Sequence, residues 1–467
     1  MGIDLIAITR RSPTRQQFPT VPQPPSSNNH MGRFPRVFAF VVCLSSVAFA
    51  SQPDPLLTRI DALAASEAKA GLLSGVLLVA RGDRVLLQRE YGYSGWELRA
   101  PVTNATRFGI GSITKVMTEM AVEMLAAEGR LSLDAPVSRY LGSFPTGPKG
   151  GVVTIRHLVN HRSGVPHRVT TEMEEMLPLH PSDVVDRVRA KGLLFEPDAQ
   201  ELYSSAGFSC LARVIEVIEG KRFDVVLRER IFQPAAMAAT SGETGQQLMP
   251  NRALPHRLAA SAAAVVVASA QYKNLGFLTG AGSLYSTAED LLRFARALRN
   301  GTFGSAGNKR VDQSASQTWR SWYGRTDGYE ASVDVLPAQD VTFIFLSNLR
   351  SAANWQLREQ VKNLLSGRNT APILRPPSPL DVVWDPPESF VGSYGDESDP
   401  VVVRVVDGHL FRDENEFYPI ERGRYCIPAS GSVFRFRRRN DGAVDAMVTT
   451  SPWTAEDRVT VKLPRRD

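Results

Sequence analysis

The sequence predicts an α+β fold for most of the chain, followed by a small antiparallel β domain. Three observations support this prediction. Strand-like segments open and close residues 56–365 while helical patterns fill the middle. A Pro-rich stretch at 366–387 interrupts the pattern, and residues 388–467 hold short strands with turn residues between them. Because strands bracket the helices of the first region, it is most simply one domain whose terminal strands share a sheet.

The composition is that of a globular protein. The chain has 467 residues, 43% of them hydrophobic and 22% charged, which excludes long disorder over most of its length. The net charge is +6, but residues 1–50 contain five arginines and a single acidic residue, Asp4. The short basic run around Arg435 and Arg437–Arg439 alternates with phenylalanines, as in an exposed strand. We therefore predict no nucleic-acid partner.

The first fifty residues form a leader with two parts. Residues 1–30 are polar and rich in Pro, Gln, Ser and Asn, which predicts a disordered or untranslated segment. From Met31, two arginines precede the apolar run 37–43, and Ala48-Phe-Ala50 provides small residues before Ser51. This pattern predicts a signal peptide at 31–50 and an exported protein, periplasmic or extracellular. The apolar run is too short for a stable membrane span.

Cysteine and histidine usage argues against metal and disulfide chemistry. Only Cys210 and Cys426 remain after the predicted cleavage, and they fall in different predicted domains. Neither an H-E-x-x-H motif nor a phosphate-binding P-loop motif occurs. His157 and His161 have the i, i+4 spacing of metal ligands, but no third ligand stands nearby, so a structural turn is favoured. We predict no metal and no organic cofactor.

The elements of the large domain can be assigned in order. A helix is predicted over 56–70, and strands at 75–80 and 85–88 flank the turn Arg81-Gly-Asp-Arg84. Apolar residues recur on one face of residues 113–128, and Gly129 ends that helix. Further helices are predicted over 182–191, 206–219, 223–231 and 287–299, the last with a capping box at Ser286–Glu289.

The later segments complete the prediction. Strands at 331–336 and 341–346 are joined by a turn at Pro337, and the Ala/Val-rich stretch 258–270 is predicted to be a buried or lid segment. In the terminal domain, strands are predicted at 401–406, 409–411, 432–437 and 443–449.

Ser112 and Lys115 combine a nucleophile with a base. The start of a helix places Ser112 at the positive end of the helix dipole, and Lys115 returns to the same face three residues later. A serine hydroxyl needs a base to take its proton, and a desolvated lysine can serve as one. Ser66 and Lys69 have the same spacing on a polar helix, so the pattern alone leaves a helix cap beside a solvated lysine as the alternative.

Five ordered blocks between residues 56 and 365 resemble the class C β-lactamase and penicillin-recognising serine hydrolase family. These blocks are Thr106–Lys115 continued by Gly129–Leu141, Thr154–Gly164, Tyr203–Gly207, Ala281–Phe294, and Trp322–Gly324 with Gly328-Tyr329. The resemblance implies a β-lactamase/transpeptidase-like domain over 51–365, in which helices flank an antiparallel sheet beside an all-helical subregion. The terminal domain, 388–467, resembles the lipocalin-like appendage of such hydrolases.

The resemblance also implies roles for individual residues. Ser112 matches the nucleophile, Lys115 its partner base, and Tyr203 the residue that activates the nucleophile and protonates the leaving group. Tyr203 would need a depressed pKa, for which the nearby lysine offers a cause; the alternative is a packed core tyrosine. The backbone N–H groups of Ser112 and Arg325 would form the oxyanion hole.

Two positions depart from the family pattern. Ser205 stands in place of the usual Asn of the second motif, and Trp322 in place of the Lys or His of the third. We expect Ser205, Trp322, Tyr323 and Gly324 to contact substrate, although Trp322 could instead pack the sheet. Because an indole carries no charge, capture of a substrate carboxylate is expected only if Arg325 takes over this role. Tryptophan here resembles the class VIII-type esterases.

Together these features predict a secreted serine hydrolase that acts on a small ester, amide or peptide through an acyl-enzyme at Ser112. An esterase or broad amide hydrolase ranks first. A D,D-carboxypeptidase, D-aminopeptidase or β-lactamase acting on cell-wall-type substrates ranks second. A binding module of the cell envelope that has lost catalysis is the non-enzyme alternative. The sequence leaves the substrate and the oligomeric state open.

Overall fold

A computed structural model describes the chain from residue 54 onward, with short gaps. The described residues are 54–242, 248–260, 265–308, 317–370, 387–396, 399–406, 409–412, 415–421, 424–427, 432–450 and 457–463. The predicted leader and signal peptide lie outside these residues, as does most of the Pro-rich stretch.

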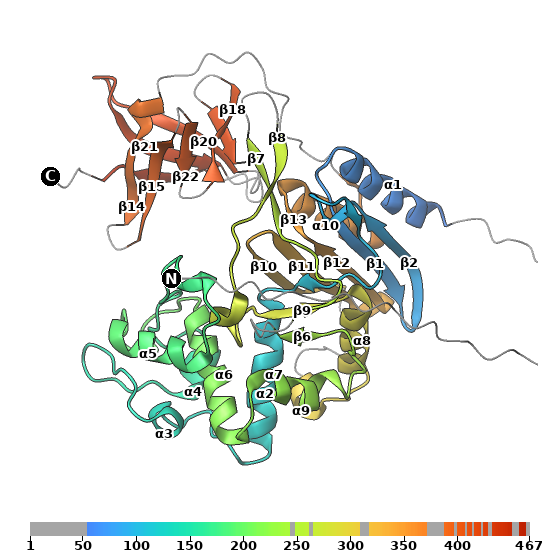
Figure 1. The fold of residues 1–467 in the computed structure, drawn as a ribbon, viewed down its shortest axis with the longest axis vertical. Coiled ribbons are helices and arrows are strands. Elements are labelled where there is room, and N and C mark those ends of the chain that lie inside the picture. The colour runs from blue at the N-terminus through green and yellow to red at the C-terminus, as the bar shows by residue number, and fades with distance from the viewer. Residues whose placement is uncertain are drawn as a thin grey trace, which may run out of the picture. The chain divides into compact units, whose positions relative to one another are not determined.

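A five-stranded antiparallel sheet forms the centre of the large domain, in the order β10-β11-β12-β1-β2 (Figure 1). Its strands are β1 (Gly75–Arg81), β2 (Arg84–Tyr91), β10 (Arg320–Thr326), β11 (Tyr329–Leu336) and β12 (Val341–Ser347). Strands from both ends of the domain meet where Gly75 pairs with Ser347. The α+β fold with terminal strands in one sheet is therefore confirmed.

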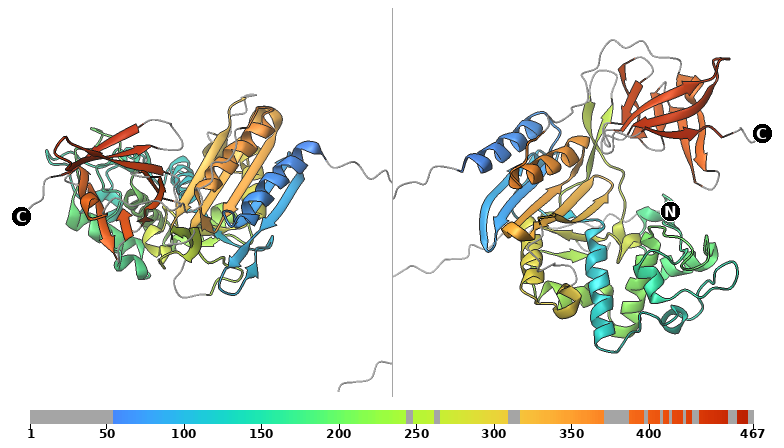
Figure 2. Two further views of the ribbon diagram at one scale, coloured as in Figure 1. Left: turned by 90° about the horizontal axis from the view of Figure 1, so that it is seen from above. Right: turned by 180° about the vertical axis from the view of Figure 1, so that it is seen from behind.

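Helices cover both faces of this sheet. On one face lie α1 (Pro55–Lys69) and α10 (Ala352–Leu365), side by side in Figures 1 and 2. On the other lie α8 (Ala288–Arg299) and the start of α2 (Ile113–Ala127), which contacts β10. Six of the seven residues of β1 are buried because both faces of the strand are covered.

A helical region, residues 113–232, packs around α2 and α6. Besides these two helices it contains short segments that connect and cover them. The elements are α3 (Ser138–Leu141), α4 (Ile155–Val159), η1 (Glu174–Met176), α5 (Pro181–Lys191), α6 (Ser205–Glu219), α7 (Phe223–Leu227) and η2 (Arg228–Phe232). The helix predicted over 223–231 is thus shorter, because α7 gives way to a π-helical turn.

The structure refines two further predictions. Helix α8 is capped by Thr287 rather than Ser286: the Thr287 side chain accepts from the Asp290 N–H, while the Ser286 hydroxyl bonds with Thr240. Residues 258–270 belong largely to a hairpin of β7 (His256–Ala260) and β8 (Val265–Ser269), and β13 (Leu349–Arg350) pairs with β7 in parallel.

The remaining elements of this domain are short. They are β3 (Tyr93–Gly95), β4 (Ala100–Pro101), β5 (Phe108–Gly109), β6 (Ser241–Gly242), η3 (Leu275–Leu278), β9 (Leu284–Ser286), α9 (Gly304–Asn308) and η4 (Pro337–Gln339).

The C-terminal residues form two antiparallel sheets, β14-β15-β16-β17 and β18-β19-β20-β21-β22. The strands are β14 (Gly392–Asp396), β15 (Asp399–Val406), β16 (His409–Arg412), β17 (Asn415–Glu416), β18 (Tyr418–Glu421), β19 (Arg424–Ile427), β20 (Ser432–Arg438), β21 (Val444–Thr450) and β22 (Asp457–Val461), after η5 (Pro387–Phe390). Buried aromatic side chains, including Phe390, Tyr394 and Phe434, form their core. None of the helices in the described ranges is long and apolar enough to cross a membrane.

Candidate active site

Ser112 stands directly before α2 with its hydroxyl turned away from helix capping. It occupies the N-cap position, yet its side chain makes no capping hydrogen bond. Instead Oγ accepts from the Tyr203 hydroxyl at 2.7 Å and lies 3.3 Å from Lys115 Nζ. The structure thus brings together the three residues predicted to carry catalysis.

Lys115 is buried beside Ser112, and within the described part of the chain it has no acidic partner. Its side chain comes from the first turn of α2 and is 6% exposed. Nζ lies 2.9 Å from the Ala281 carbonyl oxygen and 3.3 Å from Ser205 Oγ. Burial lowers the pKa of Lys115 to about 7, because a charged ammonium loses its hydration there. Near neutral pH a large share of the protein therefore holds Lys115 as a free amine.

Tyr203 has the geometry expected of it but not the expected pKa. Burial raises the pKa of its phenol, and the hydrogen bond with Ser112 offsets this only in part. The expected lowering of this pKa by the neighbouring lysine is wrong, because burial of the phenol dominates. In the resting site Tyr203 is therefore a neutral phenol that donates to Ser112 Oγ.

The start of α2 and strand β10 touch through two glycines. A Cβ atom at Gly324 would collide with the Ile110 carbonyl and lie 2.8 Å from the backbone N of Ser112. A Cβ at Gly111, where φ is +49°, would lie 2.5 Å from the backbone N of Arg325. The amide nitrogens of Ser112 and Arg325 are therefore held close to one another, as an oxyanion hole requires.

Ser205 and Tyr323 line the same pocket as Ser112. Ser205 opens α6 and reaches Lys115 Nζ through its hydroxyl, so it contacts the base in the resting site. Tyr323 projects from β10 toward α10, where its ring meets Trp355 edge-on at 6.0 Å. Burial raises the pKa of Tyr323, which keeps its phenol neutral.

Of the four predicted substrate contacts, Ser205 and Tyr323 line the pocket, whereas Trp322 and Gly324 are not among its lining residues. Side chains alternate across β10, so Tyr323 and Arg325 reach the pocket from one face while Trp322 lies on the other. Trp322 packs against the hydrophobic core, with its ring 6.3 Å from that of Phe294. The structure therefore supports the alternative role of Trp322, which is to pack the sheet.

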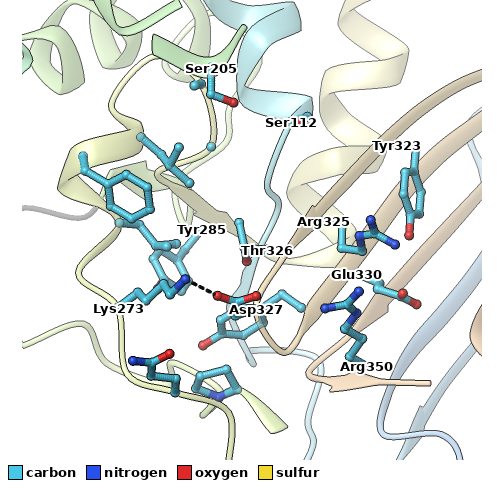
Figure 3. A pocket seen from close by; sticks show the side chains of 18 of the residues that line it. Ser112, Ser205, Lys273, Tyr285, Tyr323, Arg325, Thr326, Asp327, Glu330 and Arg350 are labelled. Carbon is cyan, nitrogen blue, oxygen red and sulfur yellow. Dashed lines mark ion pairs between the residues drawn. The ribbon is translucent and has the colours of Figure 1, made fainter. Parts of the chain in front are cut away.

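The pocket measures about 820 Å³ and is rich in charged side chains. Lys273 and Asp327 both line the pocket, with Lys273 Nζ 2.8 Å from Asp327 Oδ2 (Figure 3). Lys273 Nζ also lies 2.9 Å from Oε2 of the buried Glu175. Arg168 also approaches Glu175, at 3.7 Å. No signal in the sequence had pointed to this cluster, whose members come from segments far apart in the chain.

Two arginines of the pocket, Arg325 and Arg350, have no ion-pair partner among the described residues. Arg325 and Arg350 lie on the same side of the pocket as Glu330 (Figure 3). Within the described residues neither guanidinium makes an ion pair or hydrogen bond, and Nε of Arg350 is buried without a partner. Burial and the charge of Arg325 both lower the pKa of Arg350. An anion in the pocket would relieve this repulsion.

The two histidines with metal-ligand spacing have separate places. His157 belongs to the capping box of α4, where Nδ1 accepts from the Thr154 N–H. His161 lies beside Tyr203, with ring centroids 4.5 Å apart. Across the described stretches no three His, Cys, Asp or Glu side chains gather as metal ligands would.

Known proteins resemble this chain over the same region. Putative penicillin-binding protein PbpX of Bacillus subtilis (strain 168) is 23% identical over 306 residues, 63% of this chain and 75% of that protein. Esterase EstB of Burkholderia gladioli is 28% identical over 288 residues, 55% of this chain and 73% of the esterase. The D-amino acid amidase of Ochrobactrum anthropi SV3 superposes with a TM-score of 0.59 at 20% identity, covering 67% of this chain and 99% of the amidase.

A family model extends this similarity to nearly the whole large domain. The model described as Beta-lactamase matches residues 60–363, which include Ser112, Lys115, Tyr203 and the strands on both sides of them. The chain therefore belongs to the beta-lactamase family of serine hydrolases.

Proposed function

We propose that this protein hydrolyses a small ester or amide through an acyl-enzyme on Ser112. The observation that carries the proposal is the placement of Ser112 Oγ between the Tyr203 hydroxyl and Lys115 Nζ, at 2.7 and 3.3 Å. A nucleophile with a base and an acid within reach, on the wall of a pocket of about 820 Å³, fits acyl transfer. Esterase EstB and D-amino acid amidase are named for such reactions.

The contacts of Lys115 support its role as the base. A neutral amine has two hydrogens and one lone pair. The hydrogens satisfy the Ala281 carbonyl and Ser205 Oγ, which leaves the lone pair for the Ser112 hydroxyl. As Ser112 Oγ bonds to the substrate carbonyl carbon, its proton moves to Lys115 and the carbonyl oxygen takes up negative charge beside the two backbone amides.

Collapse of the tetrahedral intermediate breaks the bond to the leaving alcohol or amine. Tyr203, a neutral phenol next to Oγ, donates the proton that this group needs, and Lys115 returns its proton to Tyr203. Water then attacks the acyl-enzyme by the reverse proton path and regenerates Ser112. The substrate gains one water molecule in total, and no group beyond these side chains is required for the proton balance.

The test combines three probes with one variant. Purified protein and Ser112→Ala are incubated with a fluorophosphonate, a p-nitrophenyl ester and a labelled penicillin. We expect labelling and ester turnover by the wild type, both lost in Ser112→Ala. Turnover that survives in Ser112→Ala would refute the nucleophile, and a wild type inert to every probe would favour the binding-module alternative.

The second candidate, action on cell-wall-type peptides or β-lactams, is favoured by Arg325 and Arg350. Such substrates carry a free carboxylate, and planar guanidinium groups bind carboxylates well. The lining of the pocket contains six basic side chains against two acidic ones. Penicillin labelling at Ser112 would support this candidate, whereas ester turnover without labelling would support the first.

We also propose that the protein works outside the cytoplasm. The charged start, apolar run and small residues of 31–50 support export by a signal peptide. The mass of the protein isolated from its natural host tests this: we expect a chain that begins at Ser51, and a chain that retains residues 31–50 would contradict it.

A further inference from the structure

Tyr203 lies in a segment with no regular structure of its own. Residues 201–204 precede α6 without helical or strand hydrogen bonds, and the Tyr203 side chain is 45% exposed. Nevertheless its hydroxyl must stay 2.7 Å from Ser112 Oγ. Something outside the segment therefore has to fix it, since a loop alone would not hold a side chain to such a distance.

His161 bonds to this segment on both sides of Tyr203. Its backbone carbonyl accepts from the Leu202 N–H at 2.8 Å, and its ring Nδ1 accepts from the Ser204 N–H at 3.1 Å. Between these two bonds the imidazole contacts the Tyr203 ring, with centroids 4.5 Å apart. One residue thus holds the backbone before and after Tyr203 and supports the ring itself.

The backbone of His161 is shaped for this contact. The residue follows α4 with φ at +57°, a left-handed conformation that non-glycine residues adopt rarely. Its ring also packs on Phe208 of α6, with centroids 5.0 Å apart. His167 contributes from a neighbouring turn, where Nδ1 lies 3.0 Å from the Tyr203 carbonyl oxygen.

We propose that His161 is a positioning residue for Tyr203: its Nδ1 bond to the Ser204 N–H and its ring contact hold the phenol against Ser112 Oγ. This role rests on the proposed function, in which Tyr203 passes protons to the leaving group. The ring of His161 contacts Tyr203, Ser204 and Phe208, so it acts through the position of Tyr203.

The charges around His161 keep Nδ1 an acceptor. Acceptance from an N–H places the ring proton on Nε2, a tautomer inferred from the hydrogen bond. Burial lowers the pKa of His161 to about 4, and Lys115 and His167, the titratable neighbours besides Tyr203, act in the same direction. Hence the ring stays neutral across the range in which Lys115 titrates, and the Ser204 bond persists there.

Three substitutions in the full chain separate the two contacts. His161→Asn keeps an acceptor three bonds from Cα and tolerates the positive φ, but removes the ring. His161→Phe keeps a ring without the acceptor, and His161→Ala removes both. His157→Ala is the matched control: it removes the imidazole that accepts from the Thr154 N–H in the cap of α4, one turn earlier.

The readout is p-nitrophenyl ester hydrolysis, with kcat and KM measured separately and folding checked by circular dichroism. We expect His161→Ala to lower kcat about ten- to hundredfold with KM nearly unchanged, since misplacement of a reacting group by 1 Å can cost this much. His161→Asn should recover most of kcat, His161→Phe should remain impaired, and His157→Ala should match the wild type.

A second background distinguishes this proposal from the proposed function. In Tyr203→Phe, His161→Ala should cause no further loss of kcat, because the positioned hydroxyl is already gone. An equal loss of kcat in both backgrounds, or no recovery of kcat in His161→Asn, would overturn the positioning role of His161 but leave the catalytic role of Tyr203 unaffected. Full activity of Tyr203→Phe itself would overturn the catalytic role of Tyr203, and the positioning role would fall with it.

Discussion

Lys115 shows how burial at a single residue produces reactivity. An exposed lysine is protonated at neutral pH and has no lone pair to offer. At this position a carbonyl, two hydroxyls and aromatic rings surround Nζ, and no carboxylate of the described residues lies in hydrogen-bonding range. Desolvation alone therefore moves the pKa of Lys115 down to about 7.

This pKa sets the pH dependence of acylation. Only unprotonated Lys115 can accept the Ser112 proton, so kcat/KM for a neutral ester should rise with pH, reach half its limit near pH 7 and level off above. Lys115→Arg, which stays protonated, should lower the rate ~10²–10⁴-fold and remove the rise. Rates measured from pH 5 to 9 test this; a wild-type rate that falls or stays flat contradicts the assignment.

Arg350 is expected to select substrates by charge. We predict that Arg350→Gln lowers kcat/KM about ten- to hundredfold for a substrate with a free carboxylate, because a charged hydrogen bond is lost. The methyl ester or amide of the same compound should be hydrolysed as before. Arg320→Gln, on β10 but outside the pocket lining, is the control. An equal loss on charged and neutral substrates would indicate damage to the pocket.

The residues of the site differ in how far the sequence could reveal them. Ser112 and Lys115 were predictable because three residues of helix return a side chain to the same face. Tyr203 required the resemblance of ordered blocks, since nothing local links it to Ser112. Arg350 and Lys273 gave no signal, because their place in the pocket depends on how loops distant in sequence meet.

At the level of elements, the contact between β10 and the start of α2 holds the two amides of the oxyanion hole together. Gly324→Ala should therefore lower kcat ~10²–10³-fold, since the added methyl would push β10 off Ile110 and Ser112. Gly129→Ala is the control: φ there is +70°, yet the space around it is open. Kinetics and thermal unfolding test both; a Gly324→Ala enzyme with wild-type kcat would contradict the close contact.

The periodicity of the sequence located most helices and strands. It did not predict where each element ends or which of its faces meets the pocket. Apolar patterns were sufficient to predict α2, α6 and the hairpin of β1 and β2, because each of these elements buries one regular set of side chains. Helix α10 was not predicted, and α7 proved shorter than expected. Trp322 was misplaced because alternation along a strand fixes two faces without saying which one meets the pocket.

At the scale of the whole domain, the pocket lies where the sheet region meets the helical region. Ser112 starts a helix that touches the sheet edge, and Tyr203 and Ser205 come from the segment around the start of α6. Lys115 and Tyr203 belong to the helical region, whereas Arg325, whose amide completes the proposed oxyanion hole, belongs to the sheet. The two regions must therefore keep their spacing for the proposed acyl transfer. Direct contacts between the two regions across the pocket therefore support catalysis even where they touch no substrate.

Lys273 makes such a contact, because it forms ion pairs with Glu175 of the helical region and with Asp327 at the end of β10. Lys273→Met should lower the free energy of unfolding by ~3 kcal/mol, because Glu175, 2% exposed in its side chain, loses a partner for its buried charge. Lys273→Met with Glu175→Gln should recover much of this loss. Urea unfolding of the three proteins measures this loss. A double variant no more stable than Lys273→Met would show that the Glu175 charge left without Lys273 is not the cause.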